Sequence, residues 1–246
     1  MFRKRQQKST VKVAHPQAYT DMALTVHVVH GEVSYGFPQE IVLQLRHMVT
    51  KLERQQRLPR KLSMISALRS EGVSLTTLAL ATIIAHDFSR TVCVVDLNWW
   101  WPSEPMRHFS SFSSGIMPLL RGEVEWDSAL VRTNFPNLAI LPAGTLPIEQ
   151  RPIIARNIAL KGLIDTLSEQ VDHLFLDVPA ILTTSDAIPL ASLGEACCVV
   201  VHQGISTRSV VRHALGELNH LPTLGVVMNR VKVATPSWLL QWIPQE

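Results

Sequence analysis

Short apolar runs alternate with longer amphipathic segments along most of the chain. The short runs predict strands at 62–67, 91–95, 138–141, 173–177, 196–202 and 223–228. The segments between them predict helices at 74–87, 127–132, 153–170, 184–193 and 206–219. Val, Ile and Leu follow one another in the runs without alternating polar residues, so we expect strands that are buried on both faces. The pattern therefore predicts a doubly wound α/β fold, with a mostly parallel sheet and helices on both faces.

The start of the chain follows a different pattern. Residues 1–36 are polar and basic, and we expect them to be irregular. A helix is predicted from Pro38, because apolar residues recur at near-helical spacing as far as Leu52. We therefore divide the chain into this N-terminal segment, a domain with its N-terminal helix at 37–232, and a short tail at 233–246.

Composition and charge narrow the class of protein. The chain is 46% hydrophobic and 17% charged, with a formal net charge of +3. No apolar run reaches the ~18 residues of a membrane span, and the polar start has no signal-peptide core, so we expect a soluble intracellular protein. The basic head is either a solvated tail or a contact with an anionic membrane surface. The chain has no strong basic stripe for a duplex, so no nucleic-acid partner is expected.

Polar groups follow three of the predicted strands. The loop 68–74 follows the first strand, Asp96 follows "VCVV", and Asp177 follows "LFL". Ligands of open α/β sheets gather at the carboxyl ends of the strands. A glycine-containing loop that opens a helix, together with two strand-end aspartates, therefore predicts a phosphate-binding site.

The loop has most of the residues that such a site needs. The stretch "SALRSEGVS", Ser66 to Ser74, places Gly72 and the Ser74 hydroxyl at the offsets of a phosphate-binding loop. Val73 stands where that kind of loop has its lysine. The loop is thus a nucleotide site, a site that has lost this function, or an ordinary strand-to-helix turn.

Three motifs in order resemble those of a known family. Ser66–Leu75, Cys93–Pro102 and Val171–Ala180 resemble "SALPGEGKST", "LLIDADLRRP" and "YDFVIIDTPP". These motifs are typical of the cytoplasmic ATPase domain of bacterial tyrosine kinases (BY-kinases) of polysaccharide export, relatives of the MinD and ParA P-loop ATPases. The resemblance spans residues 31–232 and implies a MinD-like P-loop NTPase fold.

The resemblance also assigns roles to particular residues. It implies ATP or ADP as ligand, with Asp96 and Asp177 as catalytic residues and with Mg²⁺ on Ser74, Asp96 and Asp177. The nucleotide-binding residues that it implies are Arg69, Ser70, Glu71, Gly72, Ser74, Leu75, Asn229 and Arg230, the last two at the adenine.

Two departures from the family pattern bear on activity. Val73 has no charge for the β/γ-phosphates, and Asn98 replaces the second acidic residue of the second motif with a neutral amide. Nucleotide and Mg²⁺ binding are therefore expected to be weak or absent. Arg69 could stand in for the lysine, although an exposed loop arginine without a partner is the commoner finding.

Two further features concern assembly. The family has a helix with Glu-x-x-Arg-x-x-Arg that is used in ring-like oligomers. Here Glu40 and Arg46 remain and Leu43 replaces the middle arginine, so the helix either assembles a ring or only packs on the domain. The run Trp99–Trp101, in place of a leucine and two arginines, is either a surface for a partner or a plug over the cleft.

The function expected from the resemblance is that of a degenerate, non-catalytic regulator or scaffold in capsular or exopolysaccharide biosynthesis and export. Its partner would be the inner-membrane polysaccharide co-polymerase, the chain-length regulator, which would place it in the cytoplasm at that membrane. A homo-oligomer, or a hetero-oligomer with an active paralogue, is expected. The alternatives are a weakly active ATP-binding kinase or ATPase of the same pathway, and a MinD- or ParA-like positioning ATPase. The last is disfavoured because Leu68 replaces the extra loop lysine of those proteins.

Overall fold

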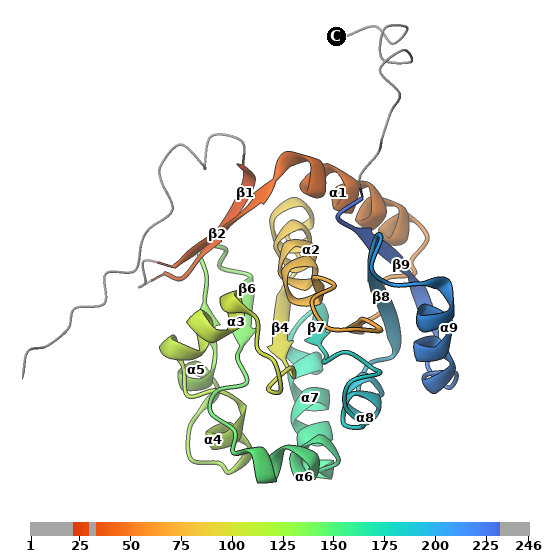
Figure 1. The fold of residues 1–246 in the computed structure, drawn as a ribbon. Coiled ribbons are helices and arrows are strands. Elements are labelled where there is room, and N and C mark those ends of the chain that lie inside the picture. The colour runs from red at the N-terminus through yellow and green to blue at the C-terminus, as the bar shows by residue number, and fades with distance from the viewer. Residues whose placement is uncertain (1–21, 30–32, 232–246) are drawn as a thin grey trace, which may run out of the picture.

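A mostly parallel sheet of seven strands forms the centre of the molecule (Figure 1). The computed structural model describes residues 22–29 and 33–231. The strand order is β5-β6-β4-β7-β3-β8-β9, and all neighbours are parallel except β5 with β6. The strands are β3 (Lys61–Ile65), β4 (Val92–Asp96), β5 (Val131–Arg132), β6 (Leu138–Leu141), β7 (His173–Asp177), β8 (Ala196–His202) and β9 (Thr223–Asn229).

Helices cover both faces of this sheet (Figure 1). They are α1 (Gln39–Arg54), α2 (Val73–Phe88), α3 (Glu104–Phe109), α4 (Ile116–Leu120), α5 (Trp126–Ala129), α6 (Arg151–Ala155), α7 (Ile158–Gln170), α8 (Ala187–Ala191) and α9 (Arg208–Glu217), with 3₁₀ turns at Ser110–Phe112 and Ile148–Gln150. One apolar core lies among α1, α2 and their face of the sheet, and the other lies under α7, α8 and α9. The two cores confirm the predicted doubly wound α/β fold.

Successive residues of β4 show why the apolar runs are continuous. Val92 and Val94 belong to the core beside α2, whereas Cys93 and Val95 belong to the core beside α7. A strand in the middle of the sheet buries both sets of side chains, so neither set is polar. Helix α2 is apolar around most of its circumference for the same reason, since it is buried almost throughout.

A β-hairpin forms within the segment that was expected to be irregular. Strands β1 (Met22–His27) and β2 (Ser34–Pro38) pair antiparallel, and the Val29 N–H bonds the Arg132 carbonyl at 3.2 Å, next to β5. Leu24, Val26 and Val28 are buried, so this part of the segment has the two-residue period of a half-buried strand. The expectation of irregular structure is wrong here, while residues 1–21 lie outside the described residues. The division into domains stays a prediction.

Several predicted helices have different bounds in the structure. The helix expected at 127–132 is wrong: α5 ends at Ala129, and β5 follows as an antiparallel edge strand on β6. The helix expected at 153–170 is divided into α6 and α7, because the Asn157 side chain accepts a hydrogen bond from the Ala159 N–H and begins a new helix there. The helices expected at 184–193 and 206–219 are shorter, as α8 and α9. Helices α3 and α4 were not predicted.

Candidate functional site

The loop between β3 and α2 requires a glycine where it meets the helix. Gly72 has φ of +93°, which disfavours any residue with a side chain. A Cβ atom at this position would also lie 2.1 Å from the Asn229 Nδ2 atom. The glycine therefore serves both the turn and the close approach of β9 to the loop.

Glu71 holds the loop to the end of β8. Its side chain is fully buried and accepts hydrogen bonds from the Leu68 N–H at 2.7 Å, the His202 N–H at 3.0 Å and the Ser206 hydroxyl at 2.5 Å. The Asn229 side chain donates to the Glu71 carbonyl at 2.8 Å. The carboxylate is thus occupied by the protein itself, and its part in the loop is structural.

Val73 occupies the first position of α2 and is 8% exposed. Its side chain belongs to the apolar core beside α2. The residue that stands in the place of the family's lysine is therefore part of the packing under the loop and brings no charge to it. Ser74 follows it, is buried as well, and keeps a hydroxyl at the helix start.

Two carboxylates lie together beneath the loop. Asp96 and Asp177 are register partners at the ends of the adjacent strands β4 and β7, and both are fully buried. The Asn98 N–H donates to Asp96 Oδ1 at 2.9 Å. Within the described residues, no donor forms a hydrogen bond of normal geometry with Asp96 Oδ2 or with either oxygen of Asp177, although the Ser74 hydroxyl lies near Asp177. Burial raises the pKa of Asp96 to about 6, against the backbone donors of Asn98 and Ala143. Burial and the charge of Asp96 raise the pKa of Asp177 well above its usual range, more than the Ser74 hydroxyl lowers it.

This set of oxygen atoms fits a small hard cation. Mg²⁺ prefers oxygen ligands, carboxylates above all, and three buried carboxylate oxygens here form no hydrogen bond with any part of the chain that the structure describes. Asp96, Asp177 and Ser74 would hold such an ion, which would neutralise charge on a bound phosphate. The structure thus brings together the three residues expected at the metal.

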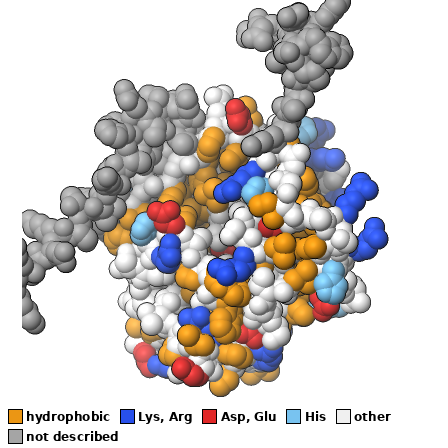
Figure 2. Space-filling view, viewed as in Figure 1, with side chains coloured by type: hydrophobic (Ala, Val, Ile, Leu, Met, Phe, Trp, Pro, Cys, Tyr) orange, Lys and Arg blue, Asp and Glu red, His pale blue; other side chains and the backbone are white. Residues whose placement is uncertain are grey.

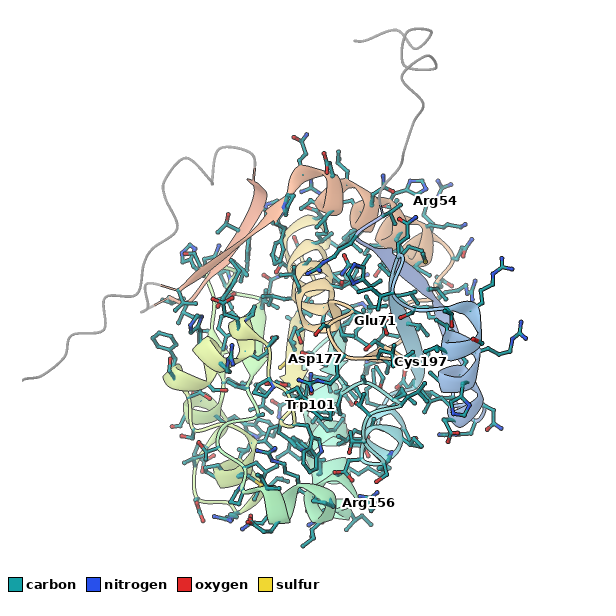
Figure 3. The ribbon with its side chains drawn as sticks, in the orientation of Figure 1. Arg54, Glu71, Trp101, Arg156, Asp177 and Cys197 are labelled. Carbon is teal, nitrogen blue, oxygen red and sulfur yellow. The ribbon has the colours of Figure 1, made fainter. Side chains whose placement is uncertain are left out.

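A cleft of about 690 Å³ opens over the loop and the start of α2. Glu71 and Trp101 line this cleft, whereas Asp96 and Asp177 do not; Figure 3 labels Glu71, Asp177 and Trp101. The expected site residues that line the cleft are Arg69, Ser70, Glu71, Gly72, Val73, Ser74, Leu75 and Asn98. Its other walls come from α3 and the segment before it, from Tyr35 of β2 and from the residues after β7; Trp100, Trp101 and Arg107 are among them and were not assigned to a nucleotide from the sequence.

Three tryptophans follow β4, and each has a different environment. Trp99 is buried in the core, and the Trp100 Nε1–H donates to Asp186 Oδ2 at 3.0 Å. The Trp101 ring lies under the Arg69 guanidinium, 4.4 Å from its centroid. Trp101 therefore lines the cleft, and both roles considered for this run stay predictions.

The remaining expected residues lie at the margin of the site or outside it. Asn229 reaches the loop, but its amide is bonded to Glu71, and its Oδ1 accepts the Arg230 N–H at 2.8 Å. Arg46 of α1 forms an ion pair with Asp87 at 2.5 Å. Glu40 is exposed at the start of α1. The adenine and oligomer roles of these residues stay predictions.

The relatives of this chain include a polysaccharide transport protein and a tyrosine-protein kinase. No family model matches the chain. It is 27% identical over 175 residues to the succinoglycan biosynthesis transport protein ExoP of Rhizobium meliloti (strain 1021), which covers 70% of this chain but only 22% of ExoP. It is 23% identical over 180 residues to the tyrosine-protein kinase CpsD of Streptococcus agalactiae, covering 72% of this chain and 78% of CpsD.

Two solved structures share the fold of this chain. The chimerical protein CapA2B2 superimposes with a TM-score of 0.70 at 19% identity, covering 78% of this chain and 85% of the other. The MinD protein of Pyrococcus horikoshii OT3, complexed with Mg-ADP, has a TM-score of 0.56 at 22% identity, covering 74% and 75%.

The chain therefore has the fold of the MinD-like P-loop NTPases. Among its homologues are bacterial tyrosine kinases and a protein of polysaccharide biosynthesis and transport. Within the described residues, no helix is both long enough and apolar enough to cross a bilayer.

Proposed function

We propose that this protein is a degenerate, non-catalytic relative of the BY-kinases that acts as a regulator or scaffold in capsular or exopolysaccharide biosynthesis and export. The observation that carries this proposal is Val73, which lies in the core where the family's loop has its lysine. The loop around it remains formed, because Glu71 and Gly72 hold it in place. The protein would thus keep the shape of an ATP-binding member without the charge that phosphoryl transfer requires.

The energetic consequence of Val73 is large enough to matter. A charge-assisted contact to phosphate contributes ~1.5–3 kcal/mol, so its absence weakens nucleotide binding roughly 10–150-fold. Loss of that charge from the transition state costs on the order of 10²–10³ in rate. Asn98 adds a second defect, because its amide cannot accept a proton at neutral pH and its Oδ1 lies 3.4 Å from the Trp101 N–H, which donates to it.

The expected partner is the inner-membrane polysaccharide co-polymerase, and the expected location is the cytoplasmic face of that membrane. Support comes from one sequence relative, which is a succinoglycan biosynthesis transport protein, and from the likeness in fold to the chimerical protein CapA2B2. Nucleic acid is not an expected partner. On the face drawn in Figure 2, several Lys and Arg side chains of the described residues lie at the right and others lie singly elsewhere, without a continuous stripe across the face.

A phosphate-release assay tests the proposal. Purified protein with ATP and Mg²⁺ should release no phosphate above the background of an Asp177→Asn variant, and it should not phosphorylate tyrosine in a partner. A catalytically active relative such as CpsD serves as the positive control. Turnover by the wild-type protein at rates close to that of the control would contradict the proposal.

A weakly active ATP-binding kinase of the same pathway is the second candidate. Asp96, Asp177 and Ser74 favour it, because the residues that would hold Mg²⁺ are all present with free carboxylate oxygens. Slow, Mg²⁺-dependent phosphate release that disappears in Asp96→Asn would support this candidate. A MinD-like positioning ATPase has no comparable support, since Leu68 replaces its extra lysine.

A further inference from the structure

Arg69 presents an unpaired charge at the mouth of the cleft. It lies in the loop four residues before Val73, and its side chain is exposed. In the described part of the chain its guanidinium forms no ion pair and no hydrogen bond, and it stacks on the Trp101 ring at 4.4 Å. An arginine that is held on an aromatic face but has no anionic partner keeps its donors available for a ligand.

The surface that holds Arg69 is itself fixed. Trp100, the neighbour of Trp101, donates to Asp186, which also accepts from Arg156 at 2.6 Å. The Arg151 guanidinium lies over the Trp100 ring, 5.0 Å from the ring centroid. Trp101 therefore follows a residue whose side chain is held by these contacts, and its ring can restrict Arg69 to a position over the cleft.

The start of α2 offers sites for an anion in the same cleft. Helix α2 begins without a side-chain cap, so the N–H groups of its first turn have no acceptor from such a cap. Near Ser74 of this turn, Asp177 is fully buried, and neither of its oxygens forms a hydrogen bond of normal geometry within the described residues, so it could hold a cation that accompanies the phosphate. The loop, the helix start and Arg69 all line the same cleft.

We propose that Arg69, positioned by Trp101, is the cation that binds the phosphate groups of a nucleotide in this cleft, in place of the absent lysine. The inference rests on the proposed nucleotide-type cleft. Arg107 is the other basic residue that lines the cleft within the described chain, and it lies on α3, outside the loop. Arg69 is thus the basic residue that the loop itself brings to the cleft.

A fluorescent ATP analogue, titrated with and without Mg²⁺, tests the inference by anisotropy. Arg69→Ala should weaken binding about 10-fold or more, as expected when a charge-assisted contact is lost. Trp101→Ala should weaken it about 2–5-fold, the value of an exposed cation–π contact. Because the tryptophan acts through the arginine, the double variant should bind no more weakly than Arg69→Ala alone. Arg212→Ala, on the exposed face of α9, is the matched control and should bind as the wild type does.

Three outcomes would overturn the inference. The first is binding by Arg69→Ala within twofold of wild type, and the second is tighter binding by Trp101→Ala, which would mean that the ring holds Arg69 away from the ligand. The third is no binding of the analogue by the wild-type protein at millimolar concentration. None of these touches the proposed non-catalytic function, which fails separately if the same wild-type sample turns over ATP.

Discussion

Replacing Glu71 with alanine tests whether the loop is held by the protein itself. The Glu71 carboxylate is fully buried and accepts from two backbone N–H groups, of Leu68 and His202, and from the Ser206 hydroxyl. No solvent reaches this carboxylate, so the three donors depend on it. The change would leave them without an acceptor and would separate the loop from the end of β8.

The size of the effect follows from these contacts. Each buried donor without an acceptor costs about 1–3 kcal/mol, so the two backbone groups alone give about 2–6 kcal/mol. Water entering from the adjacent cleft would satisfy part of this, which favours the lower half, about 2–4 kcal/mol. Against a total stability of about 5–15 kcal/mol, such a loss is easily measured. Glu71→Gln keeps one acceptor oxygen and should lose about half as much.

Urea denaturation followed by circular dichroism measures the free energy of unfolding. Glu217→Ala, an exposed glutamate at the end of α9, is the control and should change stability by less than about 0.5 kcal/mol. If Glu71→Ala unfolds within about 1 kcal/mol of the wild type, the three contacts do not hold the loop and the reasoning is wrong.

Three further predictions concern the site and the oligomer helix. The pKa of Asp177 is raised in the folded state, so the folded state binds more protons than the unfolded chain. The stability of the wild-type protein should therefore fall as pH rises from about 4 through the raised pKa. Thermal melts between about pH 5 and 8 should show a smaller fall for Asp177→Asn. Val73→Lys should tighten binding of an ATP analogue roughly 10–150-fold, yet only its combination with Asn98→Asp should raise phosphate release well above either single variant. Arg46→Ala should cost about 0.5–1 kcal/mol in urea, because the lost pair with Asp87 is partly exposed, and a dissociated ring in sedimentation would show that Arg46 also serves assembly.

The sequence predicted the sheet because a strand that is buried on both faces has a continuous run of apolar residues. Residues 92–95 are apolar one after another, and they divide between the two cores as expected of a central strand. The hairpin was missed because its apolar positions, such as Leu24 and Val26, alternate within a segment whose average composition is polar. Strand β5 was missed because it is two residues long and exists only through its pairing with β6.

The sequence predicted which residues lie at the site, but it did not predict the contacts that their side chains make. Asp96 and Asp177 follow strands that were recognised, and adjacent parallel strands bring them together. The role of Glu71 in nucleotide binding stays a prediction, but the contacts of its carboxylate with His202 and Ser206, far away in the chain, are revealed by no local pattern. The contact of Trp101 with Arg69 was equally hidden, because it joins two loops that follow different strands.

These contacts explain how the loop can stay formed without its lysine. In a loop that depends on bound phosphate for its shape, loss of the lysine would also loosen the fold. Here the shape is set by Gly72 and by the Glu71 carboxylate, and the position of the lysine is filled by Val73 as part of the core. Loss of the lysine therefore removes that residue's contribution to phosphate binding but leaves the surface around the cleft intact. Under the proposed scaffold function, this surface is the part of the molecule that a partner would bind.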